Sequence, residues 1–134
     1  PVNKIEIIEL RTDSKYGKFL IHKPSEVDID IQRKGEKAII TINNFISPSI
    51  IHRLNNEDKL IKIKIPDYRS MIDVVLVDTD YSDKSFNIVY SDVPEKKNDL
   101  VLGKYDLEIP KKKTKIAIKI IDMLGEEILI TKII

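Results

Sequence analysis

Cysteine and tryptophan are absent from this chain of 134 residues, and glycine occurs at only four positions. Without cysteine there can be no disulfide, no thiol nucleophile and no cysteine-ligated zinc. The glycines do not form the GxGxxG or GxxxxGK patterns of phosphate-binding loops. The two histidines, His22 and His52, have neither HxH nor HExxH spacing, and no GxSxG motif is present. The sequence therefore predicts neither a metal site nor a Ser-His-Asp triad.

The chain also lacks a large net charge and a long apolar run. A net charge of +1 argues against a protein that coats nucleic acid by bulk electrostatics. No apolar run approaches the ~20 residues of a membrane span. The missing cysteine suits a reducing compartment, so we expect a cytoplasmic protein, with no cofactor bound in these residues.

The start of the chain bears on its domain organisation. Pro1 stands within an apparent strand, without an initiator methionine, so we expect a segment of a longer polypeptide or a processed product. Residues 1–25 are predicted to form an N-terminal strand or linker that joins a preceding domain. Residues 26–134 are predicted to form one domain, because this length buries enough surface for a single core.

Alternation of apolar and polar residues is present along most of the chain, and such a period of two is typical of half-buried strands. Roughly nine short strands with turn signals about every 8–12 residues favour an all-β fold, an antiparallel immunoglobulin-like β-sandwich. Residues 72–77 are almost continuously apolar and are predicted to form a central strand covered on both faces. The predicted strands are 27–32, 37–43, 61–65, 72–77, 86–90, 105–109 and the two runs of the terminal hairpin, with weaker candidates at 4–10 and 19–22.

One stretch, ISPSIIHRLNNE, breaks the alternation. Ser47 can cap a helix and Pro48 can occupy its first position, so we predict one short helix near residues 48–55. Turn residues are equally specific elsewhere. Gly35 predicts a hairpin turn, and Asp122 with Gly125 predicts the turn of a terminal hairpin whose isoleucines fill the core between the sheets.

Lysines are concentrated in residues 96–119, which hold eight lysines against three acidic residues, a local balance of +5. At the centre of this stretch are four candidate nucleic-acid-binding residues: Lys111, Lys112, Lys113 and Lys115. Ammonium groups on a loop can displace counterions from a nucleic-acid backbone. The alternative interpretation is a solvated turn whose lysines discourage edge-to-edge strand pairing.

Two groups of carboxylates are candidates, one for a calcium site and one for a general acid–base pair. Residues 78–83 place oxygen-bearing side chains as a calcium loop does, but Asp83 stands where glycine is needed and Val89 where glutamate is needed. We therefore predict an Asp-rich turn. Asp67 and Asp73 could act as general acid and base, but Arg69 is near enough in sequence to form a structural salt bridge instead. No catalytic residue is assigned, and we expect no enzymatic activity in these residues.

Four strings of the sequence resemble the C-terminal region of adenine-specific DNA methyltransferases, the modification subunits of type III-like restriction–modification systems. These are FISPSIIHRLN (45–55), DYRSMIDVVLVDTDY (67–81), FNIVYSDVPEKKNDLVLGKYDLEIP (86–110) and IKIIDMLGEEILIT (118–131). The resemblance covers most of residues 26–134. It implies a DNA-modification context.

The sequence departs from that family in its catalytic motifs. The family transfers a methyl group from S-adenosylmethionine to adenine N6 with an FxGxG-type loop and a DPPY-type loop, and neither occurs here. The resemblance thus implies a non-catalytic accessory domain that contacts the backbone of double-stranded DNA or docks on another subunit.

Two further possibilities concern protein partners. The docking partner would be the parent methyltransferase domain, a second copy or the restriction subunit, with Tyr68, Tyr81 and Tyr90 as candidate anchors unless they are buried. The alternative function is an immunoglobulin-like protein–protein interaction module unrelated to DNA.

Overall fold

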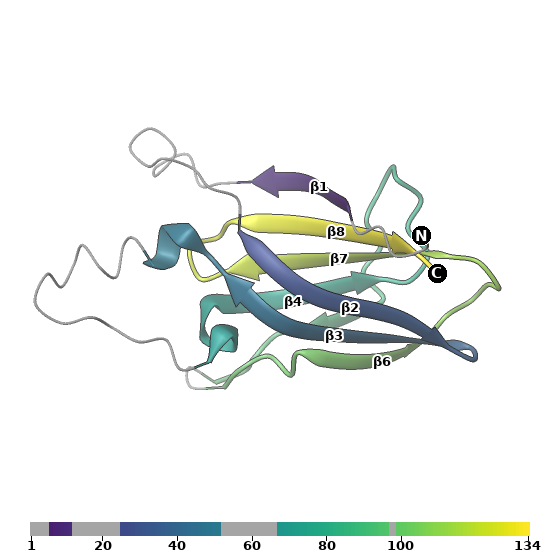
Figure 1. The fold of residues 1–134 in the computed structure, drawn as a ribbon, viewed down its shortest axis with the longest axis horizontal. Coiled ribbons are helices and arrows are strands. Elements are labelled where there is room, and N and C mark those ends of the chain that lie inside the picture. The colour runs from purple at the N-terminus through teal and green to yellow at the C-terminus, as the bar shows by residue number, and fades with distance from the viewer. Residues whose placement is uncertain (1–5, 12–24, 52–66, 97–98) are drawn as a thin grey trace, which may run out of the picture.

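The computed structural model describes residues 6–11, 25–51, 67–96 and 99–134, and for 6–11 the backbone alone. Two antiparallel sheets face each other in an all-β sandwich, as the sequence predicts (Figure 1). The larger sheet has the order β1-β8-β7-β4-β5 and the smaller has the order β2-β3-β6. The strands are β1 (Glu6–Arg11), β2 (Glu26–Lys34), β3 (Lys37–Ile46), β4 (Ile72–Asp78), β5 (Tyr90–Asp92), β6 (Lys104–Glu108), β7 (Lys115–Asp122) and β8 (Glu127–Ile133).

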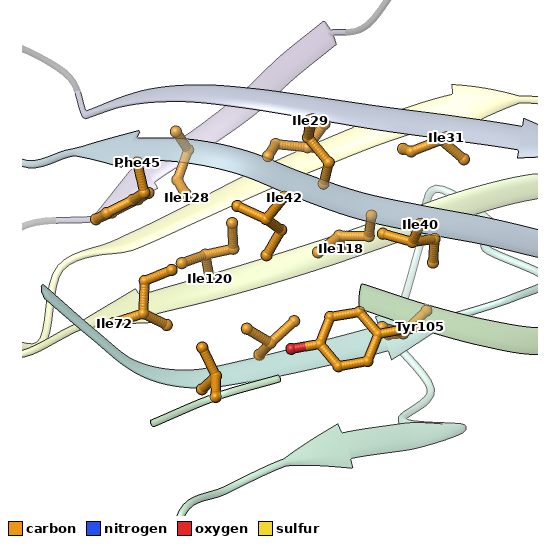
Figure 2. Close-up of a cluster of buried hydrophobic side chains, with 14 of the residues drawn as sticks. Ile29, Ile31, Ile40, Ile42, Phe45, Ile72, Tyr105, Ile118, Ile120 and Ile128 are labelled. Carbon is orange, nitrogen blue, oxygen red and sulfur yellow. The ribbon is translucent and has the colours of Figure 1, made fainter. Parts of the chain in front are cut away.

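Alternating isoleucines form the core because every second side chain of a strand faces the opposite sheet. In β7 and β8 the pairs Ile118–Ile130 and Ile120–Ile128 are in register, and all four side chains are buried. Figure 2 shows Ile118, Ile120 and Ile128 directed into the space between the sheets, toward isoleucines of the smaller sheet. The buried members from the smaller sheet are Ile29, Ile31, Ala38, Ile40, Ile42, Phe45 and Tyr105.

The predicted helix begins where the sequence places it. Residues 48–51 are helical, and the Ser47 hydroxyl accepts a hydrogen bond from the amide of Ile50 at 3.3 Å. The same hydroxyl donates to Asp122 at 3.2 Å, which ties the start of the helix to the β7–β8 hairpin. Residues 52–55, where the helix is predicted to end, lie outside the described residues, as do the predicted strands at 61–65 and 19–22.

One predicted strand is wrong. Residues 85–89 have no strand geometry, and β5 is confined to Tyr90–Asp92. The alternation of side chains predicts a strand here, but the segment bends back toward the preceding turn. The amide of Asn87 there donates to the Asp78 carboxylate at 2.8 Å. The prediction for β4 holds in part. β4 lies between β7 and β5, and its inner face is buried, whereas Val74 and Leu76 on its outer face are only half-buried.

Strand 6–11 belongs to the larger sheet, where β1 pairs with β8 in an antiparallel ladder. The connections between the strands gather at the two ends of the sandwich (Figure 1). The β2–β3 hairpin turn, the β4–β5 loop and the β6–β7 loop lie together at the right-hand end of the view. The β7–β8 turn and the start of the helix lie at the opposite end.

Candidate nucleic-acid interface

Two basic segments that lie far apart in sequence meet at one end of the sandwich. We call this part of the surface the basic end. It consists of Arg33 and Lys34 of the β2–β3 hairpin and of Lys111, Lys112 and Lys113 of the β6–β7 loop. The Arg33 guanidinium joins them. It donates to the carbonyl of Lys111 at 3.2 Å and to the carbonyl of Lys112.

Local sequence explains why the hairpin presents Arg33 in this way. Gly35 and Glu36 form a two-residue turn, and Gly35 has a φ of 65°, which glycine adopts without a steric penalty. Arg33 Nε donates to the carbonyl of Gly35 at 3.1 Å, so all three guanidinium nitrogens are engaged. The amide of Ile109 donates to the carbonyl of Glu36 at 2.9 Å. The hairpin turn therefore holds the start of the loop that follows β6 through a backbone hydrogen bond.

The other side of the β6–β7 loop is held by a buried threonine. Thr114 Oγ1 donates to the carbonyl of Thr79 at 2.6 Å, and the Thr114 backbone exchanges two hydrogen bonds with Ile134. The amide of Tyr81 donates to the carbonyl of Lys115 at 2.9 Å. The loop is thus attached to the β4–β5 loop at one side and to the hairpin at the other, with its lysines between them.

The structure divides the four predicted lysines into two pairs. Lys111 forms an ion pair with Asp80 at 3.1 Å, and Lys115 forms one with Asp83 at 2.6 Å. Lys112 and Lys113 are exposed, and their ammonium groups have no acidic or hydrogen-bonding partner among the described residues. The same holds for Lys34 on the hairpin. Three solvated cations therefore remain open at the basic end.

Sequence reasoning missed Arg33 and Lys34. The hairpin itself was predicted, but the bonds from Arg33 span 78 and 79 residues. No local pattern encodes a contact over that distance. The available signal was the composition of the turn, in which three of the five residues 33–37 are basic.

The chemistry open to the basic end is contact with phosphate. Ammonium groups offer charge and rotatable donors but no planar surface for bases. None of the described aromatic side chains is exposed, so the described surface has no platform for stacking unpaired bases. Acidic residues also border this end, since Lys37 pairs with Asp106 at 3.8 Å and Glu36 is exposed at the turn. The local positive field is therefore confined to the tips of the two segments.

The carboxylates considered as general acid and base do not form a pair. Asp67 accepts from Arg69 Nη2 at 2.8 Å and from Arg69 Nε at 3.1 Å, which confirms the salt-bridge alternative. Those hydrogen bonds hold the pKa of the Asp67 carboxyl below its usual value. Arg69 also donates to the carbonyl of Val101 at 3.2 Å. Asp73 is exposed on β4.

The Asp-rich stretch is a turn, as predicted. Asp78 is buried, and its carboxylate accepts from the amides of Asp80 at 2.9 Å and Asn87 at 2.8 Å. No group of three or more metal-ligating side chains occurs among the residues whose placement is described. His22 and His52 lie outside those residues.

The three candidate anchor tyrosines are half-buried. The Tyr68 hydroxyl donates to the carbonyl of Ile42. Tyr90 packs against Tyr105 with ring centroids 5.5 Å apart, and Tyr81 packs against Phe86 at 6.2 Å. These contacts give the three tyrosines a structural role, and their use as anchors for a partner stays a prediction.

Asp122 is a buried acid with a structural role. Its Oδ1 accepts from the amides of Leu124 at 2.9 Å and Glu126 at 3.0 Å, which shapes the β7–β8 turn. Burial raises the pKa of the Asp122 carboxyl, although the hydrogen bonds from Glu126, Leu124 and Ser47 act in the opposite direction. The β7–β8 turn that this acid shapes lies at the end of the sandwich remote from the β2–β3 hairpin turn (Figure 1).

Comparisons with family models, with curated proteins and with solved structures returned no match. Within the described part of the chain, no helix has both the length and the apolar character needed to cross a bilayer. The functional argument therefore depends on the geometry of the basic end.

Proposed function

We propose that this domain is a non-catalytic accessory domain that contacts the phosphate backbone of double-stranded DNA through the basic end. The observation that carries the proposal is the Arg33 bridge. It joins two basic segments and leaves Lys34, Lys112 and Lys113 without an acidic partner among the described residues. Lysines held on two tied loops can reach neighbouring phosphates without ordering a long flexible segment first.

Duplex DNA fits this surface better than single-stranded nucleic acid. Lysine contacts to phosphate carry no base information and position a protein on the duplex backbone. Single-strand binding proteins add exposed aromatic rings, which the described surface does not offer.

The resemblance to the C-terminal region of adenine-specific DNA methyltransferases supplies the context of the proposal. In that context the domain would belong to the modification enzyme of a cytoplasmic restriction–modification system. S-adenosylmethionine chemistry would reside elsewhere in the parent protein, since the cofactor and catalytic loops are missing from this sequence. The domain would add salt-sensitive affinity beside the target site.

The test is binding of a short duplex DNA across a salt series. Three lysine–phosphate contacts predict a slope of log affinity against log salt near −3, since each contact contributes about −0.9. The K112E/K113E variant should lose measurable binding at low salt while its melting temperature stays close to that of the wild type, because both side chains are exposed. Lys111 is left unchanged because K111E would place a second carboxylate beside Asp80.

The matched control is K96E/K104E, which makes the same charge change at exposed lysines outside the basic end. This control should retain most of the wild-type affinity. If K112E/K113E and K96E/K104E weaken binding equally, the basic end is not the contact and only net charge matters.

A second candidate function is an immunoglobulin-like protein–protein interaction module unrelated to DNA. One observation favours it. Five of the exposed large apolar residues lie outside the strands, next to β5 or in the segment that precedes β6: Ile88, Val89, Val93, Leu100 and Leu102. The amide of Leu102 donates to Asp92 of β5 at 2.7 Å, which brings the second segment beside β5. Clustered apolar exposure marks interaction surfaces. The absence of duplex binding at low salt would favour this candidate over the proposed function. Capture of the parent methyltransferase domain or the restriction subunit would instead support an accessory domain that acts by docking.

A further inference from the structure

We propose that Asp80 and Asp83 determine the selectivity of the basic end. Asp80 pairs with Lys111 and Asp83 pairs with the neighbouring Lys115, until a polyanion displaces the two carboxylates. This inference rests on the proposed function and adds a role for the β4–β5 loop. The observation behind it is that Lys111 and Lys115, which flank the open Lys112 and Lys113, are each held by a carboxylate of that loop.

The two ion pairs are accessible to solvent, so another anion can replace their carboxylates. Lys111 and Asp80 are 61% and 46% exposed, so water and other ions reach both groups. Lys115 is 23% exposed and its partner Asp83 is 58% exposed. The exposed Lys111–Asp80 pair belongs to a kind that is weak. In the Lys115–Asp83 pair the lysine is half-buried, but its carboxylate partner is open to solvent. A phosphate oxygen can therefore take the place of either carboxylate on the ammonium group.

The carboxylates are not needed to shape their own loop. The backbone of the β4–β5 loop is held by Asp78, which accepts from the amides of Asp80 and Asn87. The buried Thr114 hydroxyl fixes the carbonyl of Thr79, one residue before Asp80. Among the described residues, the carboxylates of Asp80 and Asp83 accept hydrogen bonds from Lys111 and Lys115 and none from the backbone of the loop.

The consequence is that binding requires several closely spaced phosphates. A single phosphate gains little by exchanging one carboxylate for itself. A duplex presents one negative charge per ≈ 1.7 Å of its axis, so it can engage the open lysines first and then displace Asp80 and Asp83. Asp80 and Asp83 therefore give the domain its selectivity for duplex DNA over small phosphates.

The test compares wild type with the D80N/D83N variant. Asparagine retains the shape of aspartate without its charge, and it tolerates the positive φ of 68° found at Asp83. We expect D80N/D83N to bind a short duplex about three- to tenfold tighter at low salt, because the two carboxylates no longer compete with phosphate. Its salt slope should match that of the wild type, because the duplex contacts Lys111 and Lys115 in both proteins. Both slopes should be steeper than the value near −3 that the three open lysines alone predict.

The same variant should also gain measurable binding of inorganic triphosphate, which we expect the wild type to lack. The matched control is D28N/D73N, which removes two exposed carboxylates near the first residues of β2 and β4. This control should leave the duplex affinity unchanged and should gain no triphosphate binding.

Each outcome separates the two proposals. Unchanged duplex affinity and no triphosphate binding in D80N/D83N, with duplex binding still abolished by K112E/K113E, would overturn the role of the two aspartates and leave the proposed function standing. Equal gains in D80N/D83N and D28N/D73N would likewise overturn it, because net charge would explain both. If no variant binds duplex DNA, both proposals fail.

Discussion

Arg33 is the residue on which the geometry of the basic end depends. Its three nitrogens donate to three carbonyls, of Gly35, Lys111 and Lys112. A lysine at this position keeps the charge but lacks the planar arrangement of donors. Charge and positioning can therefore be separated at this residue.

The R33K variant should bind duplex DNA about three- to tenfold more weakly than wild type, since ordering a loosened loop costs on the order of 1 kcal/mol. The salt slope should not change, because the same lysines still contact phosphate. Binding measured across salt concentrations checks this, with K34R as the matched control that keeps its charge. Wild-type affinity in R33K would show that Arg33 supplies charge alone.

Gly103 is required for a different reason. It has a φ of 80°, and a Cβ added there would lie 2.7 Å from the hydroxyl oxygen of Tyr68. That hydroxyl is fixed by its bond to the carbonyl of Ile42. Gly125 has a similar φ of 82° but open space around it.

The two glycines provide a matched comparison. Alanine at Gly125 should cost about 1 kcal/mol through backbone strain alone. Alanine at Gly103 should cost about 2–4 kcal/mol, since overpacking adds about 1–3 kcal/mol. Urea unfolding of G103A and G125A measures both, and equal losses would mean that Tyr68 moves aside without cost.

At the scale of elements, the β7–β8 hairpin is closed by a buried acid. Asp122 holds the turn through two amides and holds the helix start through Ser47. Its pKa is raised by burial, so the folded protein keeps this proton at pH values where the unfolded chain has lost it. Stability from this group is then present at low pH and is lost as pH rises through the raised pKa.

The D122N variant tests this linkage. Its amide oxygen still accepts from the two turn amides, and its Nδ2 can donate to Ser47. We expect the free energy of unfolding of wild type to fall as pH rises above about 4, the usual pKa of aspartate, and to fall less in D122N. Urea unfolding at a series of pH values gives both curves. Parallel curves for the two proteins would exclude Asp122 as the source.

At the scale of the whole molecule, one core joins the two sheets. Ile118 of the larger sheet and Ile40 of the smaller sheet are both fully buried in it (Figure 2). Neither sheet has another face with a comparable number of buried side chains among the described residues. The two layers should therefore unfold together.

The I118A and I40A variants should each lose about 2–5 kcal/mol of unfolding free energy, the usual cost of truncating a buried isoleucine. Tyrosine fluorescence and far-UV circular dichroism should report the same urea midpoint in each variant. I133A, at a residue that is half exposed, should lose far less and serves as the control. Separate midpoints for the two probes would contradict a shared core.

The resemblance to DNA methyltransferases and the phosphate-contact role also belong to this scale, and both stay predictions. The duplex-binding experiment tests the second directly. The first predicts that the natural protein also carries FxGxG-type and DPPY-type loops, and the sequence of its gene tests this.

The sequence by itself determined the layers of this protein. Alternating isoleucines, the turn at Gly35, the cap at Ser47 and the turn at Asp122 and Gly125 are local signals. Each depends on residues within a few positions of one another, so the sandwich and its terminal hairpin could be predicted. The segment 86–90 shows the limit, because its alternation was overridden by a bond to Asp78.

Only the tertiary structure decided which charges are available. It paired Lys111 with Asp80 and Lys115 with Asp83, and it brought Arg33 to a loop nearly 80 residues away. An ion pair forms where two side chains meet in space, whatever their separation along the chain. Composition therefore predicted a basic loop, and the fold selected the lysines that remain open to a phosphate.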